Sequence, residues 1–291
     1  MGLGVNMSRI VYVNGEYVSE ESAVISVFDR GFLMADAVYE VTSVLDGKLL
    51  EFDGHLKRLK RSLSELDMQE PDAINDLLEI HRTLVRDNQV DQGGVYLQVT
   101  RGVADRDFIY PENVKSTLVM FTQSKDILGS KLVEKGMKVI SIDDLRWGRR
   151  DIKTVQLLYP SMGKMMAKSA KCDDAWMVED GFVTEGTSNN AYIVVDNKII
   201  TRELSNDILH GITRNSVLRY AEEAQMEIEE RPFSVKEVLA ADEAFITSAS
   251  TFVMPVVEID GEPIGEGRPC LLYTSDAADE GLGVDLGGRR I

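Results

Sequence analysis

The strongest constraint on the fold is a pair of two-residue turns, each set between runs of alternating apolar and polar residues. The stretch "RIVYVNGEYVS" has Asn14-Gly15 at its centre, and "AVYEVTSVLDGKLLEF" has Asp46-Gly47. Tight β-hairpin turns prefer Asn-Gly and Asp-Gly, because both turn positions need a positive φ. We therefore expect two antiparallel hairpins in the first part of the chain.

The pattern then changes to a helical period. In "DGHLKRLKRSLSELDM", leucines recur at three- and four-residue steps, and Asp53 is placed to cap the first turn. Two more helices are predicted in "DAINDLLEIHRTLVRDN" and "TRNSVLRYAEEAQM", and strand-like runs such as "GGVYLQVTRG" and "MKVISIDDLRW" lie among them. The fold class is a mixed α/β (α+β) protein with much antiparallel strand.

The length of 291 residues is enough for two ordinary domains. We predict an N-terminal α/β domain over 1–124, a polar linker over 125–135 and a C-terminal domain over 136–269. The last segment, 270–291, begins "CLLYTSDAAD", which matches translated sequencing-adapter DNA. It is predicted to be a non-native tail that takes no part in the fold.

Composition narrows the function classes. A formal charge of −17 argues against a nucleic-acid partner, and no apolar run is long enough for a membrane span. Two cysteines, Cys172 and Cys270, and three histidines favour neither a disulfide framework nor a metal cluster. A reducing cytoplasm is the expected compartment.

Three lysines lie in "RRDIKTVQLLYPSMGKMMAK" and differ in their surroundings. Lys164 and Lys168 are four residues apart in a helix-like run, where they are expected to share one solvated face. Lys153 lies between a strand-like run and the apolar "TVQLL", which is predicted to cover its stem. A desolvated lysine offers a nucleophilic amine, whereas an ordinary surface charge is the alternative for Lys153 on position alone.

Three segments place hydroxyl and amide side chains where one element gives way to the next. They are "TEGTSNN", "HGITRNS" and "FITSAST", and the second opens a helix whose free N–H groups favour an anion. Turn and cap chemistry would explain each alone. Together with Lys153 they suggest a phosphate-bearing cofactor condensed with an amine. Pyridoxal phosphate is the candidate, with Glu185 as the acid that holds its ring nitrogen.

These residues resemble the class IV (fold-type IV) pyridoxal-phosphate aminotransferases, from "VYVNGEYV" to "VVEIDGEPI". The family includes D-amino-acid, branched-chain and (R)-amine transaminases and aminodeoxychorismate lyase. The resemblance implies an N-terminal α/β sandwich and a C-terminal pseudo-barrel with helices. It also implies ping-pong transamination and a homodimer whose active sites are shared, so that Arg106 or its loop can come from the neighbouring chain.

The resemblance also assigns roles to single residues. Lys153 would form the aldimine and move the substrate's Cα proton, Glu185 would hold the pyridine nitrogen, and Tyr39 would lie near the aldimine. Lys164 and Lys168 would take no part. The phosphate would be held by Arg58, Ile212, Thr213, Ser248 and Ala249, and the cofactor would be lined by Ser188 and Asn189.

The donor is open between two classes. The segment "VYLQVTRGVADRDFIYPEN" is similar to D-amino-acid transaminases, in which an Arg-x-His pair binds the substrate carboxylate. Here Arg106 matches, but Phe108 stands in the histidine position. It makes the pocket less polar and would admit a hydrophobic group, as an (R)-amine transaminase needs, whereas an ordinary packing residue is the alternative. The acceptor is a 2-keto acid in both cases.

Three other functions rank lower. A branched-chain L-amino-acid aminotransferase and an aminodeoxychorismate-lyase-like enzyme have less support from the first domain. A hypothesis from another class is an inert phosphate-ligand-binding protein of the same fold. Intact Lys153 and Glu185 count against it, because a binder needs neither.

Overall fold

A computed structural model describes residues 8–269, and the predicted non-native segment 270–291 lies outside the described residues. The chain divides into two compact units. Unit 1 consists of residues up to Asp126 together with Ile152–Gln156, and unit 2 consists of Ile127–Asp151 and the residues from Leu157 onward. Each unit has its own sheet and its own core.

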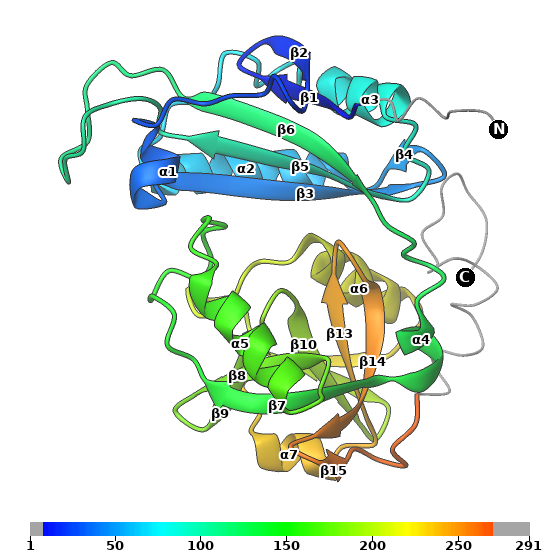
Figure 1. The fold of residues 1–291 in the computed structure, drawn as a ribbon. Coiled ribbons are helices and arrows are strands. Elements are labelled where there is room, and N and C mark those ends of the chain that lie inside the picture. The colour runs from blue at the N-terminus through cyan, green and yellow to red at the C-terminus, as the bar shows by residue number, and fades with distance from the viewer. Residues whose placement is uncertain (1–7, 270–291) are drawn as a thin grey trace. The chain divides into compact units, whose positions relative to one another are not determined.

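Unit 1 is built on a six-stranded antiparallel sheet (Figure 1). The strand order is β2-β1-β6-β5-β3-β4. The strands are β1 (Ile10–Val13), β2 (Glu16–Ser19), β3 (Ala37–Leu45), β4 (Lys48–Leu49), β5 (Gly93–Thr100) and β6 (Thr117–Ser124).

Both predicted hairpin turns are present. Asn14 and Gly15 have φ of 49° and 104° between β1 and β2, and Asp46 and Gly47 have φ of 50° and 68° between β3 and β4. Positive φ at both positions is the geometry that these dipeptides favour. The two hairpin predictions are confirmed.

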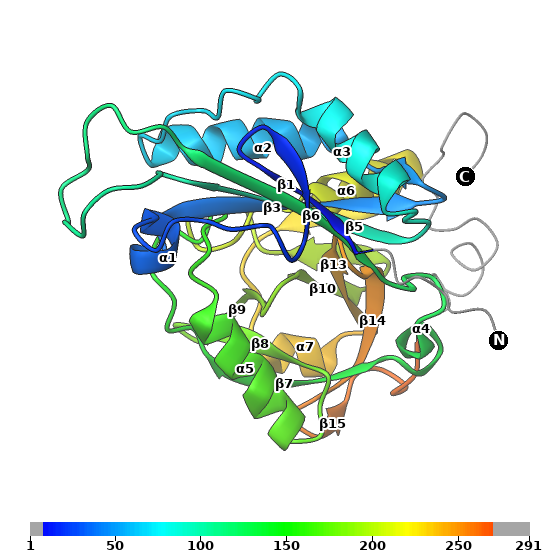
Figure 2. The same cartoon turned by 45° about the horizontal axis from the view of Figure 1, so that its top comes forward.

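Helices α2 (Phe52–Glu65) and α3 (Leu77–Asp87) lie on one face of this sheet, as Figure 2 shows, and α1 (Arg30–Met34) precedes β3. Their leucines interlock with the inward side chains of β3, β5 and β6 in a single core. The prediction of Asp53 as the N-cap was wrong, because α2 begins at Phe52, two residues earlier than that cap would place it. Glu51 is its N-cap, without a capping hydrogen bond from its side chain, and Asp53 lies in the first turn.

Unit 2 contains a nine-stranded mixed sheet in the order β12-β11-β10-β13-β14-β7-β8-β9, with β15 paired to β14. Among the described residues, three of its strand pairs are parallel: β11 with β12, β14 with β7, and β7 with β8. The strands are β7 (Met137–Asp143), β8 (Asp174–Glu179), β9 (Phe182–Gly186), β10 (Asn190–Val195), β11 (Lys198–Thr201), β12 (Glu227–Glu230), β13 (Glu243–Ser248), β14 (Phe252–Ile259) and β15 (Glu262–Pro263).

The sheet of unit 2 curls around its core. Side chains from β7, β8, β9, β10, β11, β13 and β14 meet in one cluster, and β9 also contacts β10. Such a half-barrel agrees with the predicted pseudo-barrel. Its helices are α4 (Lys131–Lys135), which falls within the predicted linker, α5 (Leu158–Ser169), α6 (Ile212–Glu223) and α7 (Val235–Ala240).

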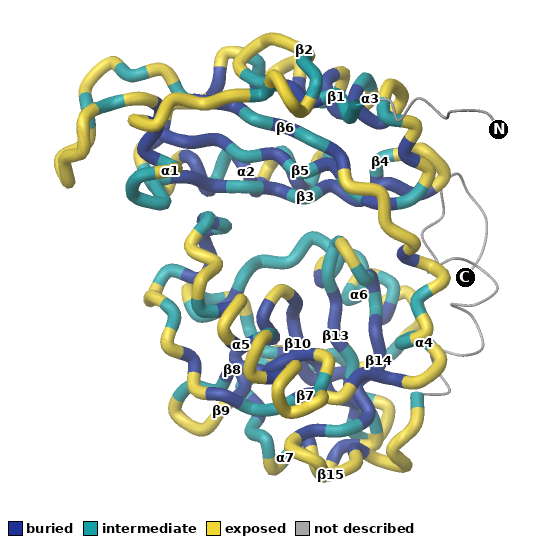
Figure 3. Tube along the Cα trace, in the orientation of Figure 1, coloured by how far each residue is buried: buried dark blue, intermediate teal, exposed yellow. Residues whose placement is uncertain are grey.

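Within each unit, the strands are more deeply buried than the loops. In Figure 3 the central strands are mostly buried, whereas the loop between β5 and β6 is largely exposed. None of the described helices combines the length and the apolar character that a membrane span requires.

His81 is a buried titratable group in the core of unit 1. Its Nδ1 donates to the Leu77 carbonyl over 2.7 Å, and its ring meets the edge of Phe52 with 5.1 Å between centroids. Burial lowers the pKa of His81 from 6.5 to about 4, because the charged ring would lose its water. The neutral ring is therefore the form that the fold contains.

We expect acid to destabilise the protein through this residue. Because the pKa of His81 is lower in the folded protein, the unfolded chain takes up the proton first as the pH falls. The free energy of unfolding therefore keeps its full value with respect to His81 above pH 6.5 and decreases as the pH falls toward 4. This decrease in the free energy of unfolding is about 3 kcal/mol. Urea unfolding at several pH values measures it, and His81→Leu should flatten the slope between pH 6.5 and 4. Parallel curves for the two proteins would contradict this assignment.

Candidate active site

Lys153 is held against β3 by backbone pairing. The Tyr39 N–H donates to the Lys153 carbonyl over 2.9 Å, and the Val155 N–H donates to the Ala37 carbonyl over 3.1 Å. Ile152, the preceding residue, is 3% exposed within the core of unit 1. The main chain on both sides of Lys153 is therefore fixed.

The amine of Lys153 lies over an aromatic ring. Its Nζ is 4.2 Å from the ring centroid of Tyr39, within the range of a cation–π contact. Burial along "TVQLL" is uneven, because Thr154 is buried and Val155 is half-buried, whereas Leu157 and Leu158 are 39% and 78% exposed. Lys153 is half-buried, and the side chain that it contacts is Tyr39.

Tyr39 is the first ring of a row. It stacks on Tyr96 with 5.6 Å between centroids, and Tyr96 stacks on Phe121 at 4.8 Å. Since side chains alternate along a strand, the three rings lie on the face of the sheet opposite α2 and α3. Burial, with the neighbouring Tyr39, raises the pKa of Tyr96 to about 12, so its phenol stays neutral. The sequence analysis missed Tyr96 and Phe121, although their alternation with core residues was visible.

Arg58 belongs to a buried polar cluster with Glu40 and His55. Its Nε and Nη2 donate to the two Glu40 oxygens over 2.8 and 2.7 Å, and His55 Nδ1 donates to Glu40 over 2.7 Å. Burial alone would raise the pKa of Glu40, but the charge and hydrogen bonds of Arg58 lower it to about 2. Burial lowers the pKa of His55. The orientation of Arg58 is thus set by a carboxylate.

Arg106 and Phe108 lie together on the exposed loop between β5 and β6. The Arg106 guanidinium is 5.6 Å from the Phe108 ring, which is 79% exposed. The loop has a buried anchor in Arg30, whose Nη1 donates to the Asp107 carbonyl over 2.6 Å. Arg30 in turn is paired with Asp36 at 2.8 Å. The segment that carries Arg106 is therefore fixed at Asp107.

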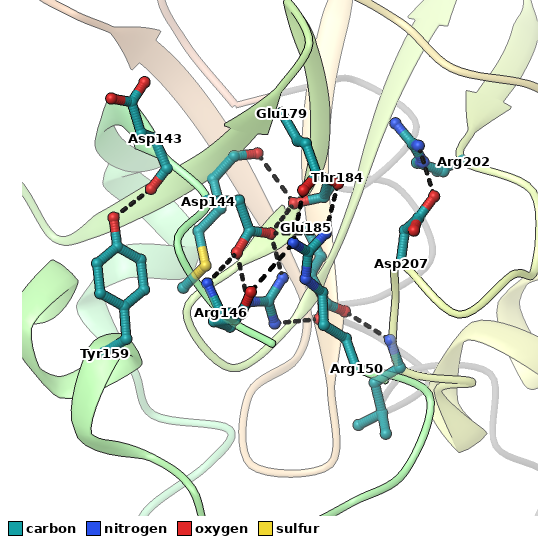
Figure 4. A network of polar contacts seen from close by, with 12 residues as sticks. Asp143, Asp144, Arg146, Arg150, Tyr159, Glu179, Thr184, Glu185, Arg202 and Asp207 are labelled. Carbon is teal, nitrogen blue, oxygen red and sulfur yellow. Dashed lines mark hydrogen bonds and ion pairs between the residues drawn. The ribbon is translucent and has the colours of Figure 1, made fainter. Parts of the chain in front are cut away.

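Glu185 lies in a polar network of unit 2 (Figure 4). Its Oε1 accepts from Arg146 over 2.5 Å, and its Oε2 accepts from Asn190 over 3.2 Å and from the Leu209 N–H over 3.1 Å. Arg146 also donates to Asp144 through Nε and Nη2, over 2.9 and 2.7 Å. The sequence analysis missed Arg146 and Asp144, which the charged run "DDLRWGRRD" after a strand could have indicated.

Asn190 joins Glu185 to the start of α6. Its amide also donates to the Leu209 carbonyl over 3.0 Å. A Cβ at Gly211, the N-cap of α6, would lie 2.1 Å from Asn190 Oδ1, so only glycine fits there. Ile212 and Thr213 follow in the first turn, where backbone N–H groups lack partners within the helix.

The remaining predicted residues divide between buried and accessible positions. Asn189 donates to the buried Asp174 over 2.6 Å, whereas Ser188 is exposed. Lys164 also pairs with Asp174, at 3.0 Å, so it is not simply a solvated charge, while Lys168 is exposed. At the end of β13, Ser248 and Ala249 are half-buried, and Ser248 hydrogen-bonds Thr251 over 2.7 Å.

The structure thus brings together Lys153 with Tyr39 and Arg106 with Phe108, and it joins Glu185 to the segment that leads into α6. No group of three or more histidine, cysteine, aspartate or glutamate side chains within residues 8–269 is placed to hold a metal ion. The roles predicted for single residues stay predictions at this point.

Comparison with known proteins decides the family. The model of the amino-transferase class IV family matches residues 37–259. The chain is a class IV aminotransferase. A D-alanine aminotransferase of Staphylococcus epidermidis is 39% identical over 259 residues, which cover 89% of this chain and 92% of the relative.

Solved structures place this aminotransferase in the same fold. The Escherichia coli branched-chain amino acid aminotransferase superposes with a TM-score of 0.85 at 21% identity, over 91% of each chain. The T.th. branched-chain amino acid aminotransferase, solved with pyridoxamine 5'-phosphate, gives 0.84 at 26% identity, over 91% of this chain and 90% of that one. The predicted family, fold and enzyme class are confirmed.

We expect Glu40→Gln to destabilise unit 1 strongly, because it removes the buried negative charge that accepts hydrogen bonds from both Arg58 and His55. Breaking a buried ion pair on one side costs about 3–5 kcal/mol. The matched control is Glu65→Gln in α2. Glu65 pairs with Arg61 at 3.7 Å, and its side chain is 36% exposed. That control should cost less than about 1 kcal/mol. Urea unfolding followed by circular dichroism compares them, and equal losses would contradict the role of Glu40.

Proposed function

We propose that this class IV aminotransferase transfers an amino group from a D-amino acid to a 2-keto acid with pyridoxal phosphate. The observation that carries the proposal is the 39% identity with a D-alanine aminotransferase over 89% of the chain. The branched-chain enzymes that share the fold are 21% and 26% identical, which supports the L-branched-chain alternative less well.

The residues present fit the cofactor. A carboxylate has about four lone-pair sites. Glu185 accepts three hydrogen bonds, from Arg146, Asn190 and the Leu209 N–H, and so retains the capacity for one more donor such as a ring N–H. Lys153 offers its amine beside Tyr39, and the first turn of α6 offers N–H groups for a phosphate.

When bound, pyridoxal phosphate supplies a ring that accepts the electrons left at the substrate Cα after its proton is removed. Lys153 would carry the cofactor, and its released amine would move the proton from the substrate Cα to C4′ of the cofactor. The fixed main chain at Tyr39 limits the positions that this amine can reach. Glu185 would keep a proton on the ring nitrogen. Thr213, Ser248, Arg58 and the backbone at Ile212 and Ala249 would hold the phosphate, and Ser188 and Asn189 would line the cofactor.

The substrate carboxylate is assigned to Arg106, because a guanidinium pairs with a carboxylate through two parallel hydrogen bonds. A second donor class, the (R)-amines, is favoured by one observation. Phe108, where a histidine is expected, is an exposed apolar ring against the Arg106 guanidinium. It could contact an uncharged substituent that a carboxylate-binding site would reject.

The remaining proposals concern the assembly and its place in the cell. We assign the chain to the cytoplasm and to a homodimer in which the loop of Arg106 serves the site of the neighbouring chain. The apolar residues exposed in unit 1 support an interface, and they include Val27, Phe28, Phe32, Val103, Phe108 and Ile109. A fully active monomer in analytical ultracentrifugation would exclude the dimer.

An inert phosphate-binding protein would need neither Lys153 nor Glu185.

The donor is tested by half-reactions of the purified enzyme without acceptor. D-Alanine, (R)-1-phenylethylamine and L-leucine are added separately, and the visible band of the bound cofactor is followed by stopped-flow absorbance. We expect D-alanine to bleach the band fastest, and Arg106→Met to slow that reaction at least roughly tenfold by removing a charged hydrogen-bond partner. Fast bleaching by the aromatic amine alone would show that the donor is an (R)-amine and not a D-amino acid. Bleaching by L-leucine alone would exclude both of these donor classes.

A further inference from the structure

Arg146 is the side chain that joins Glu185 to a second buried carboxylate. Its Nη1 reaches Glu185 Oε1 at 2.5 Å, while Nε and Nη2 form a fork with Asp144 at 2.9 and 2.7 Å (Figure 4). The side chains of Arg146, Asp144 and Glu185 are 12%, 0% and 5% exposed. The three groups interact away from bulk water, where electrostatic interactions are strong.

Asp144 is an anchor with fixed surroundings. Its own N–H donates to the Val178 carbonyl over 2.8 Å, and Thr184 donates its hydroxyl to Asp144 Oδ2 over 2.7 Å. Burial alone would raise the pKa of Asp144, but the hydrogen bonds and charge of Arg146 lower it. Burial opposes the charge of Arg146, yet the two carboxylates outweigh it and raise its pKa. Asp144 and Arg146 are therefore both ionised at neutral pH.

The network contains one negative charge more than it contains positive charges. Arg150, 3.5 Å from Asp144, is paired through both Nη atoms with Glu179 at 2.7 and 2.8 Å. Asp144, Glu179 and Glu185 give three negative charges against the two of Arg146 and Arg150, so the sum is −3 + 2 = −1. Because Glu179 is 37% exposed, solvent screens part of this excess, and a cation placed beside the buried Glu185 can offset the remainder. A protonated pyridine nitrogen is such a cation.

We propose that Arg146, held by Asp144, is a positioning residue that orients Glu185 and keeps it ionised, so that the proton shared with the cofactor resides on the ring nitrogen. The proposal rests on the proposed function. Arg146 donates to one carboxylate oxygen of Glu185. Glu185 can therefore accept a further hydrogen bond only on the side that faces away from Arg146. Asp144 offsets the charge of Arg146, which would otherwise neutralise Glu185 and remove its attraction for the ring N–H.

The test is ¹⁵N NMR of the holoenzyme with pyridoxal phosphate labelled at the ring nitrogen, together with the dissociation constant of the cofactor. We expect the wild type to show a protonated nitrogen. Arg146→Met should move the signal toward the unprotonated shift and weaken cofactor binding roughly tenfold or more, the usual effect of losing a charged hydrogen bond. Arg146→Lys should restore part of the nitrogen shift and part of the cofactor affinity, because lysine keeps the positive charge but cannot form the paired hydrogen bonds of a guanidinium.

Asp144→Asn gives an independent readout if Arg146→Met yields little folded protein. It leaves Arg146 in place but removes the charge that offsets it, so the nitrogen signal should again move toward the unprotonated shift. The matched control is Arg231→Met, which removes a guanidinium that contacts Glu229 and Glu237 in the same unit and should leave the signal unchanged.

The outcomes separate the two claims. A wild type that binds no pyridoxal phosphate would overturn the proposed function. A wild type with a protonated nitrogen, together with folded Arg146→Met and Asp144→Asn proteins that keep its shift and affinity, would overturn the role of Arg146 and leave the function standing. A signal that moves equally in Arg231→Met would also overturn it, because the effect would then be general destabilisation.

Discussion

The backbone pairing between β3 and the Lys153 segment is the interaction on which the candidate active site depends. Two N–H donors, of Tyr39 and Val155, hold this segment along the edge of β3, and Ile152 buries its side chain in the core of unit 1. These contacts place an amine over an aromatic ring without any direct hydrogen bond to the amine itself. A lysine on a free loop would have to order its backbone before it could react.

Buried carboxylates give the charged side chains of both units their orientation. Arg58 is held by Glu40, Arg30 by Asp36, and Arg146 by Asp144. Each guanidinium presents a planar fork that one carboxylate can fix, which a flexible ammonium could not offer. The chain carries a formal charge of −17, yet its buried arginines are the groups that need partners, so acidic residues are required inside as well as on the surface.

Local signals in the sequence predicted the local structure well. Asn14-Gly15 and Asp46-Gly47 encode turns through their own backbone preferences, and the leucine stripe of α2 encodes a buried face. The parallel pairs β14–β7 and β7–β8 were not foreseen, because no short motif marks strands that meet from distant parts of the chain. The site shows the same division. Lys153 and Glu185 could be named from family resemblance, but the pairing of Tyr96 with Tyr39 and of Arg146 with Glu185 depends on tertiary contacts that spacing does not reveal.

The most direct measurement is to identify the lysine that carries the cofactor. Sodium borohydride fixes pyridoxal phosphate permanently on that lysine, and mass spectrometry of the digested protein locates it. We predict a single modified peptide with the cofactor on Lys153, and unmodified Lys164 and Lys168. A cofactor found on either of these two lysines, or on none, would contradict it.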